Sequence, residues 1–202
     1  MSTTTRRWAA AALVVGLLAV AGCHQTITPS ALPPTTTVVP SPPIPSPLNG
    51  AKFTAAPCSA ITAAQLTSIG FTRVSAPAAG STGECIVNLD QSRITIFWDP
   101  SVQDHSLNHF YYYHSRGFDT GNHWEEATVD GYPGVIINIQ TGKDGSLAGE
   151  PLACTLVLGI DTTTTVVIQP DISDDPTAGP WQHDPCGAAK KIAGLAIGNL
   201  RP

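Results

Sequence analysis

Cys85–Trp98 reads CIVNLDQSRITIFW, and the fold can be worked out from this stretch. Apolar residues alternate with others on both sides of Asp90-Gln91-Ser92, which is the pattern of two half-buried β-strands joined by a short turn. We predict strands at residues 85–90 and 93–98. Three residues of the second strand share its inward face: Ile94, Ile96 and Trp98. The stretch therefore predicts a β-hairpin within an antiparallel sheet.

Further strands are predicted downstream of this hairpin. Thr128–Asp130 and Val135–Gln140 flank Gly131-Tyr132-Pro133-Gly134, an arrangement typical of strand, turn and strand. Leu152–Leu158 and Thr163–Gln169 are rich in β-branched residues and predict a second hairpin. In the strand at 135–140 we expect the inward residues to be Val135, Ile137 and Ile139.

Three helices complete the pattern. Thr62 and Gln65 form a capping box at the start of the first, and Gly70 ends it. The second spans Val102–Gly117, with apolar and aromatic residues at helical spacing. The third follows Asp184 as N-cap, starts at Pro185 and runs to about Asn199, with three residues facing the core: Ile192, Leu195 and Ala196. We predict an α+β domain with a mostly antiparallel sheet of about five to six strands, three helices and two disulfides.

The four cysteines inside the domain predict the two disulfides, since an even number outside the cytoplasm is typical of a disulfide framework. Three pairings are possible. Cys85 and Cys154 each begin a predicted strand, so we favour a bond between them across the sheet. Cys58 and Cys186 each stand at a helix start and form the second predicted pair. A zinc site or a redox pair is less consistent with the spacing, because no two of these cysteines lie close in sequence.

The N-terminal sequence predicts that the protein is located outside the cytoplasm. Arg6 and Arg7 precede the apolar run Trp8–Gly22, and small residues lead up to Cys23. This is typical of a lipoprotein signal peptide over residues 1–22, which makes Cys23 the lipidated first residue of the mature chain. The run is shorter than the roughly 20 residues that a transmembrane helix needs. Plain secretion is the alternative, and it would leave Cys23 as an unpaired thiol.

Composition separates an anchor, a linker and one domain. Residues 23–50 hold the lipidated cysteine and a stretch rich in Pro, Thr and Ser, which predicts an extended linker. Residues 51–202 form a single extracytoplasmic domain. Removal of the signal peptide takes the formal net charge from −5 to −7 because Arg6 and Arg7 are lost. An acidic chain without a basic run predicts no binding of nucleic acid.

Motifs for catalysis are absent from the sequence, so we predict no catalytic residues, no metal and no cofactor. Acyl-transfer and phosphate-binding signatures do not occur. Asp171–Asp175 resembles the opening of a calcium loop, but Pro176 and Gln182 break that pattern, and an acidic surface loop is the better interpretation. His105 and His109 have a spacing that can serve a metal, with His114 or His123 as a third ligand, but we favour surface or satisfied histidines as the interpretation.

Aromatic residues are densest between residues 111 and 124. A helix can bury only one face of three consecutive tyrosines, so at least one of them must face outward. The predicted helix and its following loop are therefore our candidate binding surface, although a core helix with one partly exposed tyrosine is also compatible with the pattern. The candidate residues are Tyr111, Tyr112, Tyr113 and Trp124.

Several motifs together resemble a known family. They are the Cys23 lipobox, Pro57-Cys58 before a helix ending in Ile69-Gly70, Gly83-Glu84-Cys85, Val129-Asp130-Gly131-Tyr132-Pro133-Gly134, the Cys154 strand and Asp184-Pro185-Cys186. In their order and spacing residues 57–200 resemble uncharacterised actinobacterial, especially mycobacterial, lipoproteins of the LprB and LprC type, which share a domain of unknown function. Ala56 departs from the family, which often has Asp there. The resemblance implies a cell-envelope lipoprotein and no catalytic residues.

Together these features predict a non-catalytic lipoprotein at the extracytoplasmic face of the cell membrane. Its partners would be the membrane, through the N-terminal lipid, and a protein, glycan or lipid of the envelope. Two alternatives remain at this point, an envelope hydrolase with an unrecognised site and a carrier of lipids or small molecules. A pocket with convergent titratable groups would favour the first, and a large apolar cavity the second.

Overall fold

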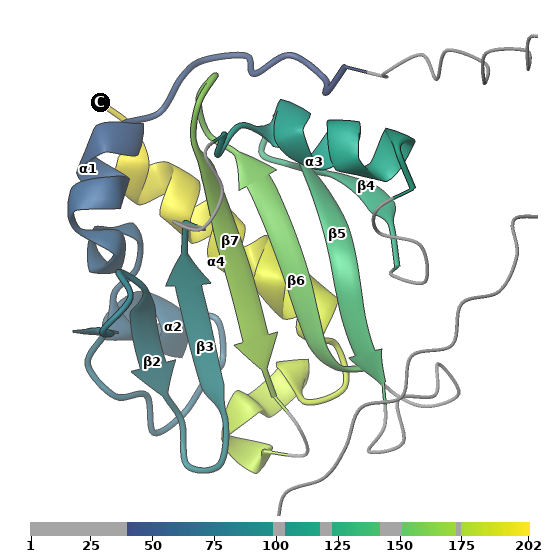
Figure 1. The fold of residues 1–202 in the computed structure, drawn as a ribbon. Coiled ribbons are helices and arrows are strands. Elements are labelled where there is room, and N and C mark those ends of the chain that lie inside the picture. Colours follow the sequence, from purple (N-terminus) through teal and green to yellow (C-terminus); the bar gives the residue numbers. More distant parts are fainter. Residues whose placement is uncertain (1–39, 99–103, 118–122, 142–150, 173–174) are drawn as a thin grey trace, which may run out of the picture. The chain divides into compact units, whose positions relative to one another are not determined.

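The predicted hairpin at residues 85–98 is present as strands β2 and β3 of an antiparallel sheet (Figure 1). The computed structural model describes residues 40–98, 104–117, 123–141, 151–172 and 175–202. Within these ranges the sheet has seven strands in the order β1-β2-β3-β7-β6-β5-β4, and every neighbouring pair is antiparallel. The strands are β1 Ala78–Ala79, β2 Cys85–Asn88, β3 Arg93–Phe97, β4 Glu125–Val129, β5 Tyr132–Thr141, β6 Pro151–Gly159 and β7 Thr165–Asp171.

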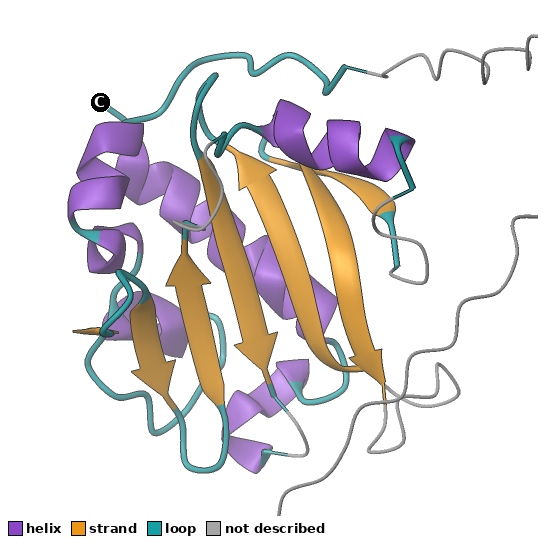
Figure 2. Cartoon of the chain, in the orientation of Figure 1, coloured by secondary structure: helices purple, strands orange, loops and turns teal. Residues whose placement is uncertain are grey.

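Helices lie on both sides of this sheet (Figure 2). The described α-helices are α1 Gly50–Ala55, α2 Ala63–Ser68, α3 Leu107–Ser115 and α4 Pro185–Leu200. Two short 3₁₀ helices, η1 Pro57–Ala60 and η2 Pro176–Trp181, precede α2 and α4 respectively. The long helix α4 packs along one face, against β6 and β7, whereas α3 packs against the other. The α+β class is confirmed, and the strand count is higher than predicted.

Two apolar clusters hold these layers together. The larger one lies on the α4 side, where alternate residues of the strands meet α4 and the segments near η1 and α2. Ile94, Ile96 and Ile168 of the sheet and Ile192 of α4 are among its fully buried members. The smaller cluster lies under α3 and consists of Leu107, Tyr111, Val135, Val157 and Val167. Strands β5, β6 and β7 are therefore buried on both faces where α3 covers them.

Local capping signals predicted the helix starts well. The Thr62 hydroxyl accepts a hydrogen bond from the Gln65 N–H, and the Gln65 side chain accepts one from the Thr62 N–H, which completes the capping box. Asp184 caps α4 by accepting from the Gly187 N–H at 2.8 Å. The helix predicted over residues 102–117 is shorter, and α3 occupies its middle.

The structure corrects the predicted turn between β4 and β5. Tyr132 and Pro133 belong to β5, and the turn is formed by Asp130 and Gly131, whose φ angles are 49° and 87°. Two residues with positive φ form a type I′ turn, which suits the twist of a hairpin. Val135 and Ile137 accordingly face α3 rather than the main core, and the side chain of Ile139 lies outside the described residues. Strand β1 was not predicted, because two exposed alanines have no alternation to detect.

The predicted disulfide pairing is wrong: the bonds are Cys58–Cys85 and Cys154–Cys186. The sheet order explains the error, since β3 and β7 lie between β2 and β6. Three strand spacings amount to about 14 Å, beyond the ~7 Å limit between bridged Cα atoms. Cys85 and Cys154 are both fully buried members of the α4-side core. Each therefore bonds to a cysteine of a helix on that side, in η1 and α4.

The end of the predicted linker packs on the domain. Leu48 is buried, and its N–H donates to the Ile160 carbonyl at 2.8 Å. The Tyr132 hydroxyl donates to the Ser46 carbonyl at 2.7 Å. These contacts place the boundary of the folded unit several residues before the predicted residue 51, because Leu48 fills space between strands and helices.

Asp175 contradicts the prediction of an acidic surface loop, because its side chain is fully buried. Its carboxylate accepts hydrogen bonds from the Gln91 N–H, the Ser92 hydroxyl and both the N–H and the hydroxyl of Thr177. Burial alone would raise the pKa of Asp175, but these hydrogen bonds outweigh it and lower the pKa to about 2. Asp175 thus ties the β2–β3 turn to η2.

Replacing this residue, Asp175→Asn, is expected to lower the free energy of unfolding by about 2 kcal/mol at pH 6, since an amide cannot accept all four bonds. The folded-state pKa lies below the unfolded value of 3.8, so the stabilisation is present above pH 4 and is lost as the pH falls toward 2. Urea unfolding of both proteins at pH 6 and near pH 2.5 measures this. An equal difference at both pH values would contradict the assignment.

Candidate functional site

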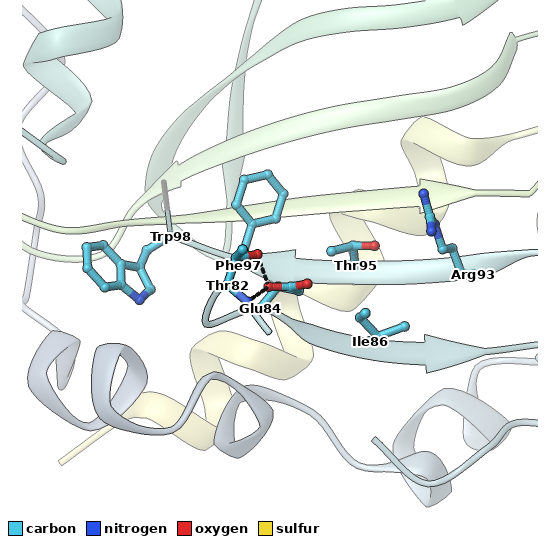
Figure 3. Close-up of a pocket in the computed structure, with 7 residues that line it drawn as sticks. All are labelled: Thr82, Glu84, Ile86, Arg93, Thr95, Phe97 and Trp98. Carbon is cyan, nitrogen blue, oxygen red and sulfur yellow. Dashed lines mark hydrogen bonds between the residues drawn. The ribbon is translucent and has the colours of Figure 1, made fainter. Parts of the chain in front are cut away.

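A groove lies where α3 leaves its face of the sheet uncovered, over β2 and β3 (Figure 3). It has a volume of about 300 Å³. We call it the sheet-face groove, and it is lined by Thr82, Glu84, Ile86, Arg93, Thr95, Phe97 and Trp98. Arg93 lies toward one end and Trp98 at the other, with Thr95 and Glu84 between them.

Strand alternation places the side chains that β2 and β3 contribute to the groove on one surface. Ile94 and Ile96 of β3 point into the α4-side core, so Arg93, Thr95 and Phe97 point to the opposite face. Their span along the strand is about 13 Å at ~3.3 Å per residue. The pairing of β2 with β3 sets Ile86 opposite Thr95. The groove is therefore a direct consequence of the hairpin sequence.

Glu84 enters the groove from a tight loop. Its carboxylate accepts hydrogen bonds from the Thr82 hydroxyl and from the Thr82 N–H, the latter at 3.0 Å. These bonds hold the pKa of the Glu84 carboxyl below its usual range. A Cβ on Gly80 would lie 2.3 Å from a Glu84 carboxylate oxygen, so this orientation requires glycine. The loop thus presents an ionised, oriented carboxylate.

Arg93 supplies the opposite charge. Its side chain is exposed, and it forms no hydrogen bond or ion pair with the residues that the structure describes. Asp171 of β7 is its neighbour in the strand register. The guanidinium presents a planar set of donors suited to a carboxylate or a phosphate.

Aromatic side chains form the other end of the groove. Phe97 packs against the cluster beneath α3. Trp98 packs against the main core and contacts the His105 ring edge-on, with centroids 4.7 Å apart. Because other side chains pack against both rings, the positions of the rings are fixed. The two rings form an apolar wall beside the Glu84 carboxylate. An apolar wall with a few placed polar groups is the usual composition of a small-molecule site.

The structure divides the predicted aromatic cluster into two parts. Tyr111 is buried, and burial together with the nearby Glu126 charge raises the pKa of Tyr111 to about 12. Trp124 contacts the Tyr111 ring at 5.2 Å and stacks on His114 at 3.9 Å, which fixes α3 to the sheet. Tyr112 and Tyr113 remain exposed, at 42% and 44%. Only these last two keep the surface position that a binding role needs.

The remaining site predictions fall in different places. Cys23 lies outside the described residues. His105 precedes α3 while His109 lies within it against Tyr113, so one helical face does not present them together. In the described part of the chain no three His, Cys, Asp or Glu side chains form a group suited to a metal. A helix long and apolar enough to cross a membrane is likewise missing from those residues.

Sequence reasoning missed the groove although its signal was present. Alternation along β3 places Ile94 and Ile96 on the face toward α4. The same alternation places Arg93, Thr95 and Phe97 on the opposite face. What alternation could not indicate is how far α3 covers that outward face, since this depends on the packing of a helix distant in sequence.

The comparisons with known proteins identify a family. A family model described as "Protein of unknown function (DUF3558)" matches residues 18–199. No curated protein matches the chain, and no solved structure does.

Proposed function

The chain belongs to the DUF3558 family of proteins of unknown function, and from this premise we propose that it is a lipid-anchored envelope protein whose domain binds an acidic saccharide in the sheet-face groove. Within the family we place it with the lipoproteins of the LprB and LprC type that its motifs resemble. The domain acts as a binding module rather than as an enzyme.

The anchor is proposed from the N-terminal sequence. Arg6 and Arg7, a short apolar run and Val20-Ala21-Gly22-Cys23 together are typical of a chain that is cleaved and lipidated at the cysteine. Two or more acyl chains give stable attachment, whereas one gives only marginal binding. The acidic mature domain has no charge of its own that would hold it on an anionic bilayer.

Replacing the anchor residue, Cys23→Ser, is expected to abolish lipid attachment completely, because serine supplies no thiol for the thioether. Metabolic labelling with an alkyne fatty acid, followed by mass spectrometry of the N-terminal peptide, measures this. Cys58→Ser serves as the control and should retain the label. Undiminished labelling of the Cys23→Ser protein would contradict the proposed anchor.

One observation carries the proposed binding activity: the groove combines an oriented carboxylate, an uncommitted guanidinium and a braced aromatic wall. A sugar ring can place an apolar face on Phe97 and Trp98. Its hydroxyl groups can donate to Glu84, while a carboxylate on the saccharide accepts from Arg93. The groove's span of about 13 Å suits a short oligosaccharide.

Other ligand classes fit these groups less well. A lipid tail would exclude water from the Glu84 carboxylate and the Arg93 guanidinium without offering either group a hydrogen bond, at a cost in desolvation. The space between the sheet and α4 is filled by buried side chains, which disfavours a carrier. A hydrolytic general acid needs a raised pKa, whereas the pKa of Glu84 is lowered. These features favour recognition of a polar ring over transport or cleavage.

The proposal is tested by calorimetric titration of residues 23–202 carrying Cys23→Ser. A trisaccharide of glucuronic acid is compared with the matching trisaccharide of glucose and with acetate. We expect saturable binding of the acidic trisaccharide, at least tenfold weaker binding of the neutral one and none of acetate. Equal binding of both trisaccharides, or of none, would overturn the proposed ligand class.

A further inference from the structure

We propose that the outer face of α3, formed by Asn108, Tyr112 and Tyr113, rests on the bilayer that holds the lipid anchor. This inference depends on the anchor of the proposed function and not on the ligand of the groove. It states what the two exposed tyrosines contact and how the domain is oriented on the membrane.

The burial of α3 defines which side faces outward. Leu107 and Tyr111 are buried against the sheet. Tyr112 and Tyr113, which follow directly, are the large apolar side chains that remain exposed among the described residues. Their rings contact one another, with centroids 5.9 Å apart. A tyrosine has an apolar ring and a polar tip, and such residues are enriched where a membrane meets water.

The chain that leads to the anchor leaves the domain on this same face. The Ser41 N–H and hydroxyl both donate to the Asn108 side-chain oxygen, at 2.9 and 2.8 Å. Asn108 and Tyr112 are four residues apart, so they lie one above the other on the helix surface. The last described contact before the anchor segment is thus one helical turn from an exposed tyrosine.

The length of the intervening chain limits how far this face can lie from the bilayer. Seventeen residue steps separate Cys23 from Pro40. They reach about 23 Å as a flexible coil and about 55 Å when fully extended. A folded unit of ~160 residues is roughly 40 Å across. Because this segment is rich in proline, its expected reach is close to the extended value, so the attachment beside Asn108, rather than a short tether, favours this surface as the one nearest the lipid.

The charge of α3 also suits an anionic surface. Residues 107–117 contain no carboxylate and end with Arg116 and Gly117, although the mature chain carries a net charge of −7 once the signal peptide is removed. An anionic bilayer repels a helix without carboxylates less than it repels the acidic remainder of the chain, although Asp161 lies beside Ser41 and Asn108. The exposed rings and the position of the tether thus point to the same surface.

The test uses the full lipidated protein in liposomes of phosphatidylcholine and phosphatidylglycerol, some with lipids brominated near the headgroup. Tyr112→Trp and Tyr113→Trp each add a tryptophan on the outer α3 face, while Lys191→Trp adds one on exposed α4 as a matched control. Emission is compared with that of the parent protein, which retains Trp98, Trp124 and Trp181. We expect brominated lipid to quench the added emission of the two α3 variants at least twofold more than that of Lys191→Trp.

Equal quenching at the α3 and α4 positions would overturn the proposed orientation. Flotation of the same liposomes separates this result from failure of the anchor. Protein that floats with the liposomes yet shows equal quenching has its anchor but not the proposed contact. Protein that does not float contradicts the lipid anchor itself, and with it this inference.

Discussion

Replacing Cys58 and Cys85 together with alanine is expected to lower the free energy of unfolding by about 3.5 kcal/mol. The bond closes a loop of 27 residues, and the chain-entropy relation for a loop of that size gives this value. Cys85 is also fully buried, so alanine removes packed sulfur from the core. Urea unfolding at neutral pH under non-reducing conditions measures the difference.

The second disulfide provides a matched comparison. Cys154 and Cys186 close a loop of 32 residues, so their double alanine variant should lose a nearly equal amount. Non-reduced peptide mapping of the unaltered protein should recover Cys58 joined to Cys85. Recovery of Cys85 joined to Cys154, or a loss of less than 1 kcal/mol in the first variant, would contradict this account.

Replacing Arg93 with alanine is expected to weaken binding of the acidic saccharide by ten- to a hundredfold while leaving unfolding nearly unchanged. The side chain is exposed and has no hydrogen-bond partner among the described residues, so its loss breaks no contact in the folded state. In the complex it donates charge-assisted hydrogen bonds, each of which contributes about 1.5–3 kcal/mol. Calorimetry with the glucuronic acid trisaccharide measures the change.

Two further variants isolate the role of the guanidinium. Arg201→Ala removes the same charge at the C-terminus, outside the sheet-face groove, and should leave the affinity within twofold. Arg93→Lys keeps the charge but loses the planar set of donors, so its affinity should fall between the other two. Equal weakening by Arg201→Ala would indicate general electrostatic attraction rather than a defined contact.

Local features of the fold were predictable from the sequence because short-range chemistry determines them. The Thr62 capping box and the Asp184 N-cap depend on residues three positions apart. The β2–β3 hairpin depends on alternation within fourteen residues. In each case the interacting groups are close in sequence, and the pattern is complete without knowledge of the rest of the chain.

Features that depend on the order of strands were not predictable in the same way. The pairing of Cys85 follows from the sheet order, in which two strands separate β2 from β6, and no local pattern reveals that order. Asp175 has the polar neighbours of a surface loop, yet it is buried because Gln91, Ser92 and Thr177 supply donors from distant segments.

In the candidate site, one feature was predictable from local sequence and another depended on the folded chain. The prediction that consecutive tyrosines cannot all be buried is confirmed at Tyr112 and Tyr113, since it follows from helix geometry alone. The groove needed the structure, because Glu84 reaches it through a loop and Trp98 through contacts with His105. Residue types identify possible ligands of a saccharide, but their convergence is a property of the folded chain.

Nuclear magnetic resonance mapping of the bound saccharide shows directly where on the domain the ligand lies. Residues 23–202 carrying Cys23→Ser are labelled with ¹⁵N and titrated with the glucuronic acid trisaccharide. We expect the amide shifts to concentrate in the Gly80–Ile86 and Arg93–Trp98 segments and to saturate with the calorimetric affinity. Shifts that concentrate elsewhere, or that are absent at saturating ligand, would contradict a saccharide site in the sheet-face groove.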